Sequence, residues 1–419
     1  MPISHSRRDV LRHGLLAAGA LGAGLPLLGA TPAAMAGATP VPTTLPPATA
    51  ALAAANLGFA FRLFGALAPA RPAATQNTFF SPLSVSIALS MLANGARGAT
   101  AAAIAATLGT QNLPLASLNG SSAALIAALA ARDPAVSLAV AEALWTRKGA
   151  TVRPAFAQAI AGPYAGQVAS LNFADPASVK VVNGWVNAKT HGLIAKIVDG
   201  LPADAVLFLI NALYFKSTWA RPFPSANTTP QPFTLLDGSK KSVPMMSTPG
   251  DFAYAQGDGY QAISLPYGSG KMSMVIVLPA PGIGFAAFQK GLTVARWRGY
   301  LASLRVQHGN IALPRFGVSY SAGLIPALSS LGMGPALGPG ADFGSIFSDQ
   351  RATVSQVQHK AVIRVYEAGT EAAAVTGVIM TTAVPANPFS MRVDRPFFCA
   401  ILDQTTGIPL FMGAILNPA

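Results

Sequence analysis

The pattern of apolar residues changes near Ala205, and this change constrains the fold more than any other feature of the chain. Before it, residues 51–68 carry an apolar stripe with the 3.6-residue period of a helix, and Pro82 opens a second helical segment. After it, short β-branched and aromatic runs alternate with Gly, Pro, Asn and Asp. Helices followed by strands predict an α+β fold with antiparallel or mixed sheets, because a repeated βαβ unit would interleave the two.

The N-terminal segment has the features of an export signal. Residues 1–36 contain the pair Arg7-Arg8, a short glycine-rich apolar run and an A-x-A sequence that ends at Ala36. The paired arginines resemble a bacterial twin-arginine signal, and prolines interrupt the apolar run before it reaches the length of a membrane anchor. We expect cleavage near Ala36 and a secreted or periplasmic protein. Residues 37–50 then predict a Pro/Thr-rich linker, and residues 51–419 a single folded domain.

Charge and cysteine content argue against several classes of partner. The formal net charge is +13, but the lysines and arginines are scattered, whereas nucleic-acid binding needs them clustered on one face. We therefore expect no nucleic-acid partner. We also expect no membrane partner, and a monomer. The single Cys399 cannot form an internal disulfide, and a buried thiol that packs as a small hydrophobe is the simplest prediction.

The residues needed for catalysis or metal binding are sparse. Outside the N-terminal segment the only histidines are His191, His308 and His359, and no two stand four apart on a helix. The sequence Gly268-Ser269-Gly270 lies between two strand-like runs, where it predicts a hairpin turn rather than a nucleophile elbow. The sequence therefore predicts no enzyme, no metal and no cofactor.

Eight motifs in a fixed order resemble the serpin family of protease inhibitors over nearly all of residues 51–419. The motifs are NTFFSPLS at 77–84, LINALYFKSTWARPF at 209–223, VPMMS at 243–247, LPYGSGKMSMVIVLP at 265–279, LPRFGVSYSAGLIPALSSLGM at 313–333, HKAVIRVYEAGTEAAAVTGV at 359–378, RPFF at 395–398 and PLFMGAILNP at 409–418. The resemblance implies the serpin fold, with a helical N-terminal part, three mostly antiparallel or mixed sheets, and residues 367–395 as an exposed reactive-centre loop.

The resemblance implies that a protease cleaves this loop, which then inserts as a strand into the central sheet and traps the enzyme. Side chains alternate along a strand, so a loop with Thr370 inward presents an uncharged face of small and β-branched residues. That face contains Thr370, Ala372, Ala374, Thr376, Val378, Met380 and Thr382, and the hinge contains Glu367, Gly369, Thr370, Glu371, Ala372, Ala373 and Ala374. The alternative is a non-inhibitory serpin that acts as a binding or storage protein.

The resemblance also implies a position for the cleaved bond. Counting forward from Glu367 gives Ala383-Val384, whereas counting back from Pro396 reaches Pro385, so Thr382 and Val384 remain alternative bait residues. A small bait residue suits elastase-like or subtilisin-like serine proteases. Trypsin-like targets are disfavoured, because no Lys or Arg lies between Gly369 and Ser390.

Other positions follow from the same motifs. Ser81, Ser84, Asn211 and His359 match the family's shutter, a buried polar cluster under the sheet that parts on insertion. Trp219 matches the breach, the top of the sheet where the loop first enters. In the strand AEALW, Glu142 stands where the family has Asn, so this position of the sheet departs from the family's hydrogen-bonding pattern. The region that corresponds to the family's heparin-binding helix, residues 110–132, contains a single basic residue, Arg132, so no polyanion cofactor is expected.

Overall fold

Ten α-helices lie in the part of the chain that the computed structural model describes, residues 45–67, 76–348, 352–370 and 388–418. They are α1 (Pro47–Leu67), α2 (Pro82–Ala93), α3 (Gly98–Leu108), α4 (Leu115–Ala130), α5 (Pro154–Tyr164), α6 (Ala177–Lys189), α7 (Phe285–Lys290), α8 (Val294–Ser303), α9 (Ile325–Leu328) and α10 (Gly334–Leu337). Two short helical turns complete the set, η1 (Ser225–Asn227) and η2 (Ser329–Met333).

Helices α1 and α2 each begin at a proline, for reasons of local chemistry. Pro82 opens α2 because its missing N–H would have no partner in the first turn, and the Ser81 hydroxyl caps the helix by accepting from the Ser84 amide at 3.1 Å. Pro47 likewise stands at the start of α1, four residues before the predicted start and inside the predicted linker. α1 has the length and hydropathy of a membrane span, but 56% of its most apolar window is buried inside the fold.

The strands form two sheets. The nine-stranded sheet has the order β1-β15-β14-β8-β7-β6-β9-β13, with β5 paired to β6, and the six-stranded sheet has the order β10-β11-β12-β4-β2-β3. The first contains β1 (Thr78–Phe80), β5 (Thr229–Thr234), β6 (Lys240–Gly257), β7 (Tyr260–Tyr267), β8 (Met272–Pro279), β9 (Arg305–Pro314), β13 (Phe389–Arg392), β14 (Phe397–Asp403) and β15 (Pro409–Ile415). The second contains β2 (Val136–Arg147), β3 (Gln167–Leu171), β4 (Leu207–Thr218), β10 (Phe316–Gly323), β11 (Val354–Tyr366) and β12 (Gly369–Thr370).

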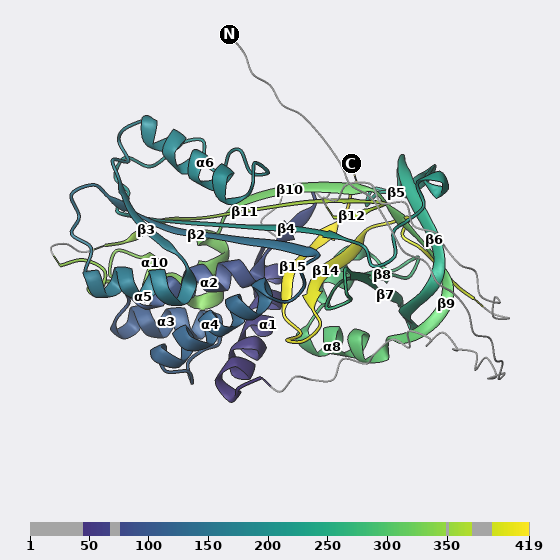
Figure 1. The fold of residues 1–419 in the computed structure, drawn as a ribbon, viewed down its shortest axis with the longest axis horizontal. Helices are drawn as coiled ribbons and strands as arrows, with labels where there is room; N and C mark the ends of the chain where they lie inside the picture. Colours follow the sequence, from purple (N-terminus) through teal and green to yellow (C-terminus); the bar gives the residue numbers. More distant parts are fainter. Residues whose placement is uncertain (1–44, 68–75, 349–351, 371–387, 419) are drawn as a thin grey trace, which may run out of the picture. The chain divides into compact units, whose positions relative to one another are not determined.

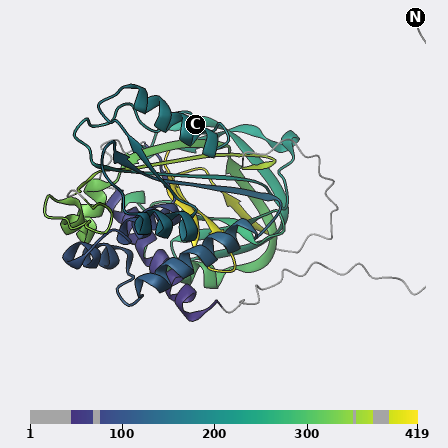
Figure 2. The same cartoon turned by 60° about the vertical axis from the view of Figure 1, so that its left-hand side comes forward.

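Helices cover both faces of the six-stranded sheet (Figures 1 and 2). On one face, α6 packs Val182 and Val186 against alternate residues of β2 and β4, such as Ala143 and Ile210. On the other face, α2 packs against the intervening residues and against β15. Burial on both faces explains why β4 is almost continuously apolar, since no side of the strand meets water.

The sequence-based prediction of an α+β fold with mixed sheets is confirmed. The described residues form two sheets rather than the expected three, because the long strand β6 pairs with β5 at one end and with β7 at the other and so joins them in one sheet. β7 and β8 form an antiparallel hairpin around the Gly268–Gly270 turn, as predicted. Cys399 is a fully buried free thiol in β14, and burial raises its pKa. It contributes packing rather than chemistry.

Candidate functional site

The centre of the six-stranded sheet contains two parallel strands that are joined along most of their length and separated at one end. Residues Val354–Ala361 of β11 pair directly with Leu207–Leu213 of β4, and we call this pairing the seam. Beyond the seam, β12 lies between the same two strands, with Thr370 opposite Val365 on one side and Ser217 on the other. The chain that leaves β11 therefore turns back at once and enters its own sheet (Figure 1).

Gly369 permits this entry because the backbones approach closely. Its φ is +150°, and an added Cβ would lie 2.2 Å from the carbonyl oxygen of Ser217 and 2.6 Å from the Cα of Thr218. Any side chain would force β4 and β12 apart. Glycine at this position is required by the strand entry itself.

Thr370 is fully buried, and its hydroxyl contacts an aromatic stack. Its hydroxyl lies 2.7 Å from the Tyr267 hydroxyl, and the Tyr267 ring stacks on Trp219 with centroids 4.3 Å apart. Trp219 in turn donates from Nε1 to the Tyr366 carbonyl at 2.9 Å, and its amide donates to the Ala368 carbonyl at 3.0 Å. Burial raises the pKa of Tyr267 well above its ordinary value, so the phenol stays neutral as a hydrogen-bonding partner.

Glu367 anchors the turn that leads into β12. Its carboxylate accepts from Arg315 Nε at 2.8 and 2.9 Å and from the Thr228 hydroxyl, while its carbonyl accepts from the Phe223 amide at 2.9 Å. Burial alone would raise the pKa of Glu367, but the hydrogen bonds from Arg315 and Thr228 lower it below the ordinary value. The start of the loop is thus fixed by charge on one side and by backbone pairing on the other.

Beneath the middle of the seam lies a buried polar cluster of five residues, Ser81, Ser84, Glu142, Asn211 and His359. Asn211 of β4 is at its centre. Its Oδ1 accepts from the Ser84 hydroxyl at 2.6 Å and lies 2.5 Å from His359 Nδ1, while its Nδ2 donates to both carboxyl oxygens of Glu142 at 2.7 and 2.9 Å. Asn211 and His359 face each other across the seam, in register.

The network determines the state of His359. Its Nε2 accepts from the Ser81 amide at 3.1 Å, so the ring proton must lie on Nδ1 and is donated to Asn211 Oδ1. Burial lowers the pKa of His359 to about 3, because a charged imidazolium would lose its hydration there. His359 is a neutral structural histidine, fully used by its two partners.

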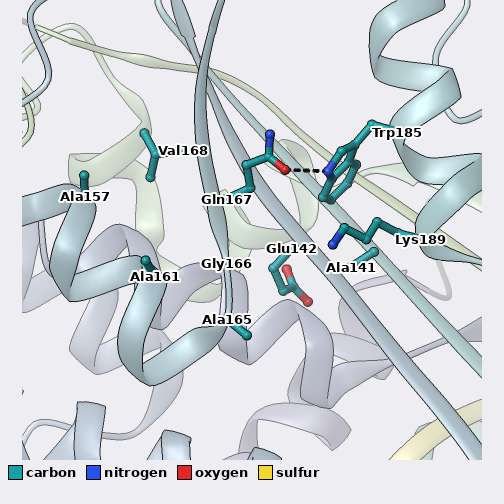
Figure 3. Close-up of a pocket in the computed structure, with 10 residues that line it drawn as sticks. All are labelled: Ala141, Glu142, Ala157, Ala161, Ala165, Gly166, Gln167, Val168, Trp185 and Lys189. Atoms are coloured by element: carbon teal, nitrogen blue, oxygen red, sulfur yellow. Dashed lines mark hydrogen bonds between the residues drawn. The ribbon is translucent and has the colours of Figure 1, made fainter.

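Glu142, drawn in Figure 3, occupies the position that departs from the family pattern. It lies beneath the middle of the seam, not at an end of the sheet, and it is hydrogen-bonded to Asn211. Burial raises its pKa well above the ordinary value, although the hydrogen bond from Asn211 opposes the shift. Because both of its oxygens accept from Asn211 Nδ2, Glu142 also fixes which way the Asn211 amide faces. That orientation presents Oδ1 to Ser84 and His359.

The structure brings together Ser81, Ser84, Asn211 and His359 in one cluster, and places Trp219, Glu367, Gly369 and Thr370 at the separated end of the seam. The remaining site residues predicted from the sequence lie outside the described residues; they are Glu371, Ala372, Ala373, Ala374, Ala383 and Val384. The next described strand is β13, which pairs in parallel with β9.

Sequence reasoning missed three residues of this site. Tyr267 and Arg315 lie within motifs that carry the family resemblance, but their contacts with Thr370 and Glu367 join segments far apart in the chain. Thr228 lies outside every motif. A strand pairing known in advance would have been the only signal for these contacts.

Comparison with known proteins gives consistent results along almost the whole chain. A family model described as serpin (serine protease inhibitor) matches residues 54–418. An uncharacterized serpin-like protein of Thermococcus kodakarensis is 34% identical over 349 residues, which cover 82% of this chain and 81% of the relative.

Solved structures show the same fold. The native state of tengpin, a thermophilic serpin, superposes with a TM-score of 0.82 at 28% identity, covering 89% of this chain and 95% of tengpin. Human thyroxine-binding globulin, solved in complex with thyroxine, also gives a TM-score of 0.82, at 27% identity, covering 89% of this chain and 100% of the globulin. The fold is therefore shared by a protein named as a serpin and by a protein named as a thyroxine-binding globulin.

Proposed function

The chain belongs to the serpin family, and from that premise we propose that it inhibits serine proteases by trapping them on its own loop. A target protease attacks a bond within residues 371–387, its serine forms an acyl ester with the loop, and the freed loop inserts along the seam between β4 and β11. Insertion carries the ester away from its original position before water can release it. Each inhibitor molecule acts once and catalyses no turnover.

The single observation that carries this proposal is the position of β12. Two residues of the loop already lie between β11 and β4, antiparallel to both. Thr370 pairs with Val365 and Ser217, and the same register continued along the seam pairs Thr376 with both His359 and Asn211. Two independent strand pairings thus lead to the same residue, as a single inserted strand requires.

The inserted strand would part the polar cluster. Asn211 and His359 lie on opposite sides of the seam, so their hydrogen bond must break when a strand enters. Thr376 shares the inward face with Thr370, and its hydroxyl can take the place of the lost partner. Glu142 and Asn211 lie on neighbouring strands β2 and β4 on the same side and would move together.

The length of the seam agrees with cleavage at Ala383-Val384. The continued register reaches Leu207, where β4 begins, at Met380. A bond three residues further would lie just past the far end of the sheet. From Thr370 to Ala383 an inserted strand spans roughly 40 Å at about 3.3 Å per residue, which would place the ester at the opposite end of the sheet from Thr370.

The energy of insertion favours the trapped state. Each hydrogen bond of a new strand contributes about 0.5–1.5 kcal/mol net, so roughly ten residues with partners on both sides gain on the order of 10 kcal/mol, part of which offsets the lost direct pairing of the seam. The uncharged inward face adds no buried charge to this sum.

The target class rests on the bait residue. Ala383 is small, and no Lys or Arg lies between Gly369 and Ser390, so we propose elastase-like or subtilisin-like targets. Thr382 and Val384 remain alternative bait residues. The export signal in residues 1–36 would deliver the inhibitor to the periplasm or the exterior, where we propose that it acts as a monomer.

A non-inhibitory serpin is the second candidate, because the fold is shared with thyroxine-binding globulin. Thermal unfolding of the intact and the loop-cleaved protein separates the two. Insertion of the cleaved loop should raise the unfolding temperature markedly, whereas a loop that stays outside the sheet would leave it unchanged.

The direct test mixes the protein, without residues 1–36, with elastase, subtilisin, chymotrypsin and trypsin. We expect a complex that survives denaturing electrophoresis with elastase or subtilisin, and a released peptide that begins at Val384 by mass spectrometry. Clean cleavage without any stable complex, together with an unchanged unfolding temperature, would reject the inhibitor in favour of the non-inhibitory serpin.

A further inference from the structure

The turn at Gly268–Gly270, which joins β7 to β8, is tied to a buried aspartate. The amide and the hydroxyl of Ser269 both donate to Asp133 Oδ2, at 2.8 and 2.6 Å, and Asp133 Oδ1 accepts from the Ala135 amide at 2.9 Å. Asp133 is 4% exposed and lies in the segment between α4 and β2. The tip of a hairpin in the nine-stranded sheet is therefore fixed to the start of a strand in the six-stranded sheet.

This turn has no room to move toward Asp133. Gly268 has a φ of +48°, and an added Cβ would lie 2.7 Å from Asp133 Oδ2. The Gly268 amide also donates to the carbonyl of Thr218 at 3.0 Å, at the end of β4. Because Tyr267 directly precedes the turn, its side chain is held in a fixed position relative to β4 and to β12, which pairs with that end of β4.

Tyr267 places its hydroxyl at the end of β12. Its ring stacks on Trp219 with centroids 4.3 Å apart, and Phe215 meets it edge-on with centroids 5.1 Å apart. These two rings fix the direction of the phenol, whose oxygen lies 2.7 Å from Thr370 Oγ1. We call the hydroxyls of Tyr267 and Thr370 the hydroxyl pair. Both residues are fully buried, so separation of the pair would cost each hydroxyl a hydrogen bond in a place that water does not reach.

We propose that Tyr267 is a positioning residue that recognises a hydroxyl at position 370 and keeps β12 in the sheet before a protease arrives, and that Asp133 positions Tyr267 through Ser269. This role rests on the proposed function, because a seated β12 is useful only if the rest of the loop follows it. The first residues of the inserting strand are ordered before cleavage, so their entropy is not lost while insertion competes with hydrolysis of the ester. A loop that starts outside the sheet would insert later and would more often be released as cut, inactive inhibitor.

Hydrogen exchange, followed by mass spectrometry on peptides that contain Gly369 and Thr370, tests the hydroxyl pair with no protease present. Thr370→Val and Tyr267→Phe each remove one member of the pair, and we expect exchange in these peptides to become about tenfold faster, the factor that one buried hydrogen bond supplies. Thr370→Ser keeps the hydroxyl and should stay close to the unmodified protein. The double variant Tyr267→Phe/Thr370→Val has neither hydroxyl to satisfy, so its exchange should return most of the way to the original rate.

Tyr164→Phe is the matched control. Tyr164 is also a buried tyrosine, and its hydroxyl donates to Asn119 Oδ1 at 2.6 Å, but it lies on α5, which packs against α2, α4 and β3. Its substitution should leave exchange at Thr370 unchanged. Asp133→Ala frees the turn that follows Tyr267 and should speed exchange, whereas Asp133→Asn, which keeps an oxygen that can accept from Ser269, should do so less.

The same variants, mixed with the protease that forms a stable complex, connect the hydroxyl pair to trapping. The number of inhibitor molecules consumed for each trapped enzyme should rise severalfold in Thr370→Val and in Tyr267→Phe, and it should stay low in Thr370→Ser and in Tyr164→Phe. The rescue by serine separates recognition of a hydroxyl from a general loss of stability.

Unchanged exchange in both single variants of the hydroxyl pair would overturn the proposal, as would equally faster exchange in Tyr164→Phe. Faster exchange without extra consumption of inhibitor would also overturn it, because the seated strand would then not serve trapping. If neither the unmodified protein nor any variant forms a complex while exchange responds as expected, the hydroxyl pair is supported and the proposed function is rejected.

Discussion

The two ends of the contact between β4 and β11 differ in how the strands are kept in place. At the β12 end the strands are already apart, and Thr370, Tyr267 and Trp219 fill the gap with a hydrogen bond and an aromatic stack. In the middle they pair directly, with Asn211 and His359 joined over the polar cluster. The described residues of β12 thus lie where the packing is aromatic, whereas β4 and β11 pair directly where the polar cluster lies.

This contrast shows where resistance to opening resides. Parallel pairing is slightly less stable per residue than antiparallel pairing, so the ladder alone is a weak closure. The cluster adds hydrogen bonds between buried polar groups. If the strands separated with nothing between them, these groups would lose their partners, at a cost of about 1–3 kcal/mol for each buried group. The seam should therefore open only when a strand with its own polar inward group follows β12.

The largest effect is expected at the separated end. Thr370→Arg would bury a cation next to Tyr267, so the loop should still be cleaved but should form no stable complex with the protease. Denaturing electrophoresis after mixing with the target measures this directly. Glu371→Arg is the matched control, since position 371 alternates to the opposite face, and its complex should persist. An undiminished complex in the Thr370 variant would contradict the insertion mechanism.

A change in the middle of the seam should act mainly on stability. Asn211→Leu removes the partner of Ser84, Glu142 and His359 together, and we expect the free energy of unfolding to fall by about 3 kcal/mol. Urea unfolding gives the value. Asn187→Leu, on an exposed turn of α6, should stay within about 0.5 kcal/mol. Equal losses at the two positions would mean that the cluster contributes nothing specific.

The two titratable members of the cluster should give pH dependences of opposite sign. The folded pKa of His359 is lowered to about 3, so its stabilising effect is complete above about pH 6.5 and falls as the pH decreases, by about 2 kcal/mol between pH 7 and pH 5. The folded pKa of Glu142 is raised, so its effect is complete below about pH 4.3 and falls as the pH increases.

Single variants separate these contributions. In His359→Gln, stability at pH 5 relative to pH 7 should improve over the unmodified protein, whereas in Glu142→Gln it should worsen. Urea midpoints from pH 5 to pH 7 provide the comparison, and only the slopes matter, not the absolute stabilities. Slopes that change in the same direction in both variants would show that at least one group is not held neutral in the fold.

The smallest effect is expected at the anchor of the loop. Glu367→Gln removes the ion pair with Arg315, whose side chain is 45% exposed, so the loss should be about 0.5 kcal/mol and should shrink in high salt. Because the pKa of Glu367 is lowered, this contribution is present above about pH 4.3 and disappears as the pH falls through the folded pKa. A loss that persists at 1 M salt would point to packing instead of charge.

Much of this arrangement could be predicted from the sequence because motif order and strand periodicity are local properties. The α+β class, the α2 start at Pro82 and the hairpin at Gly268–Gly270 all follow from residues close in the chain. The partner of Glu142 could not be predicted, because it depends on the register between β2 and β4. The contact of Thr370 with Tyr267 depends in the same way on how far β12 extends into the sheet.

The placement of the C-terminal strands decides what becomes of a cut chain. β13 pairs with β9, β14 lies between β8 and β15, and β15 also pairs with β1. The three strands of residues 388–418 are therefore hydrogen-bonded to strands from other parts of the nine-stranded sheet. A break at Ala383-Val384 would leave two polypeptides but one particle. Such a nicked molecule should elute from a sizing column at its original volume, and its two chains should part only when the sheet itself is melted.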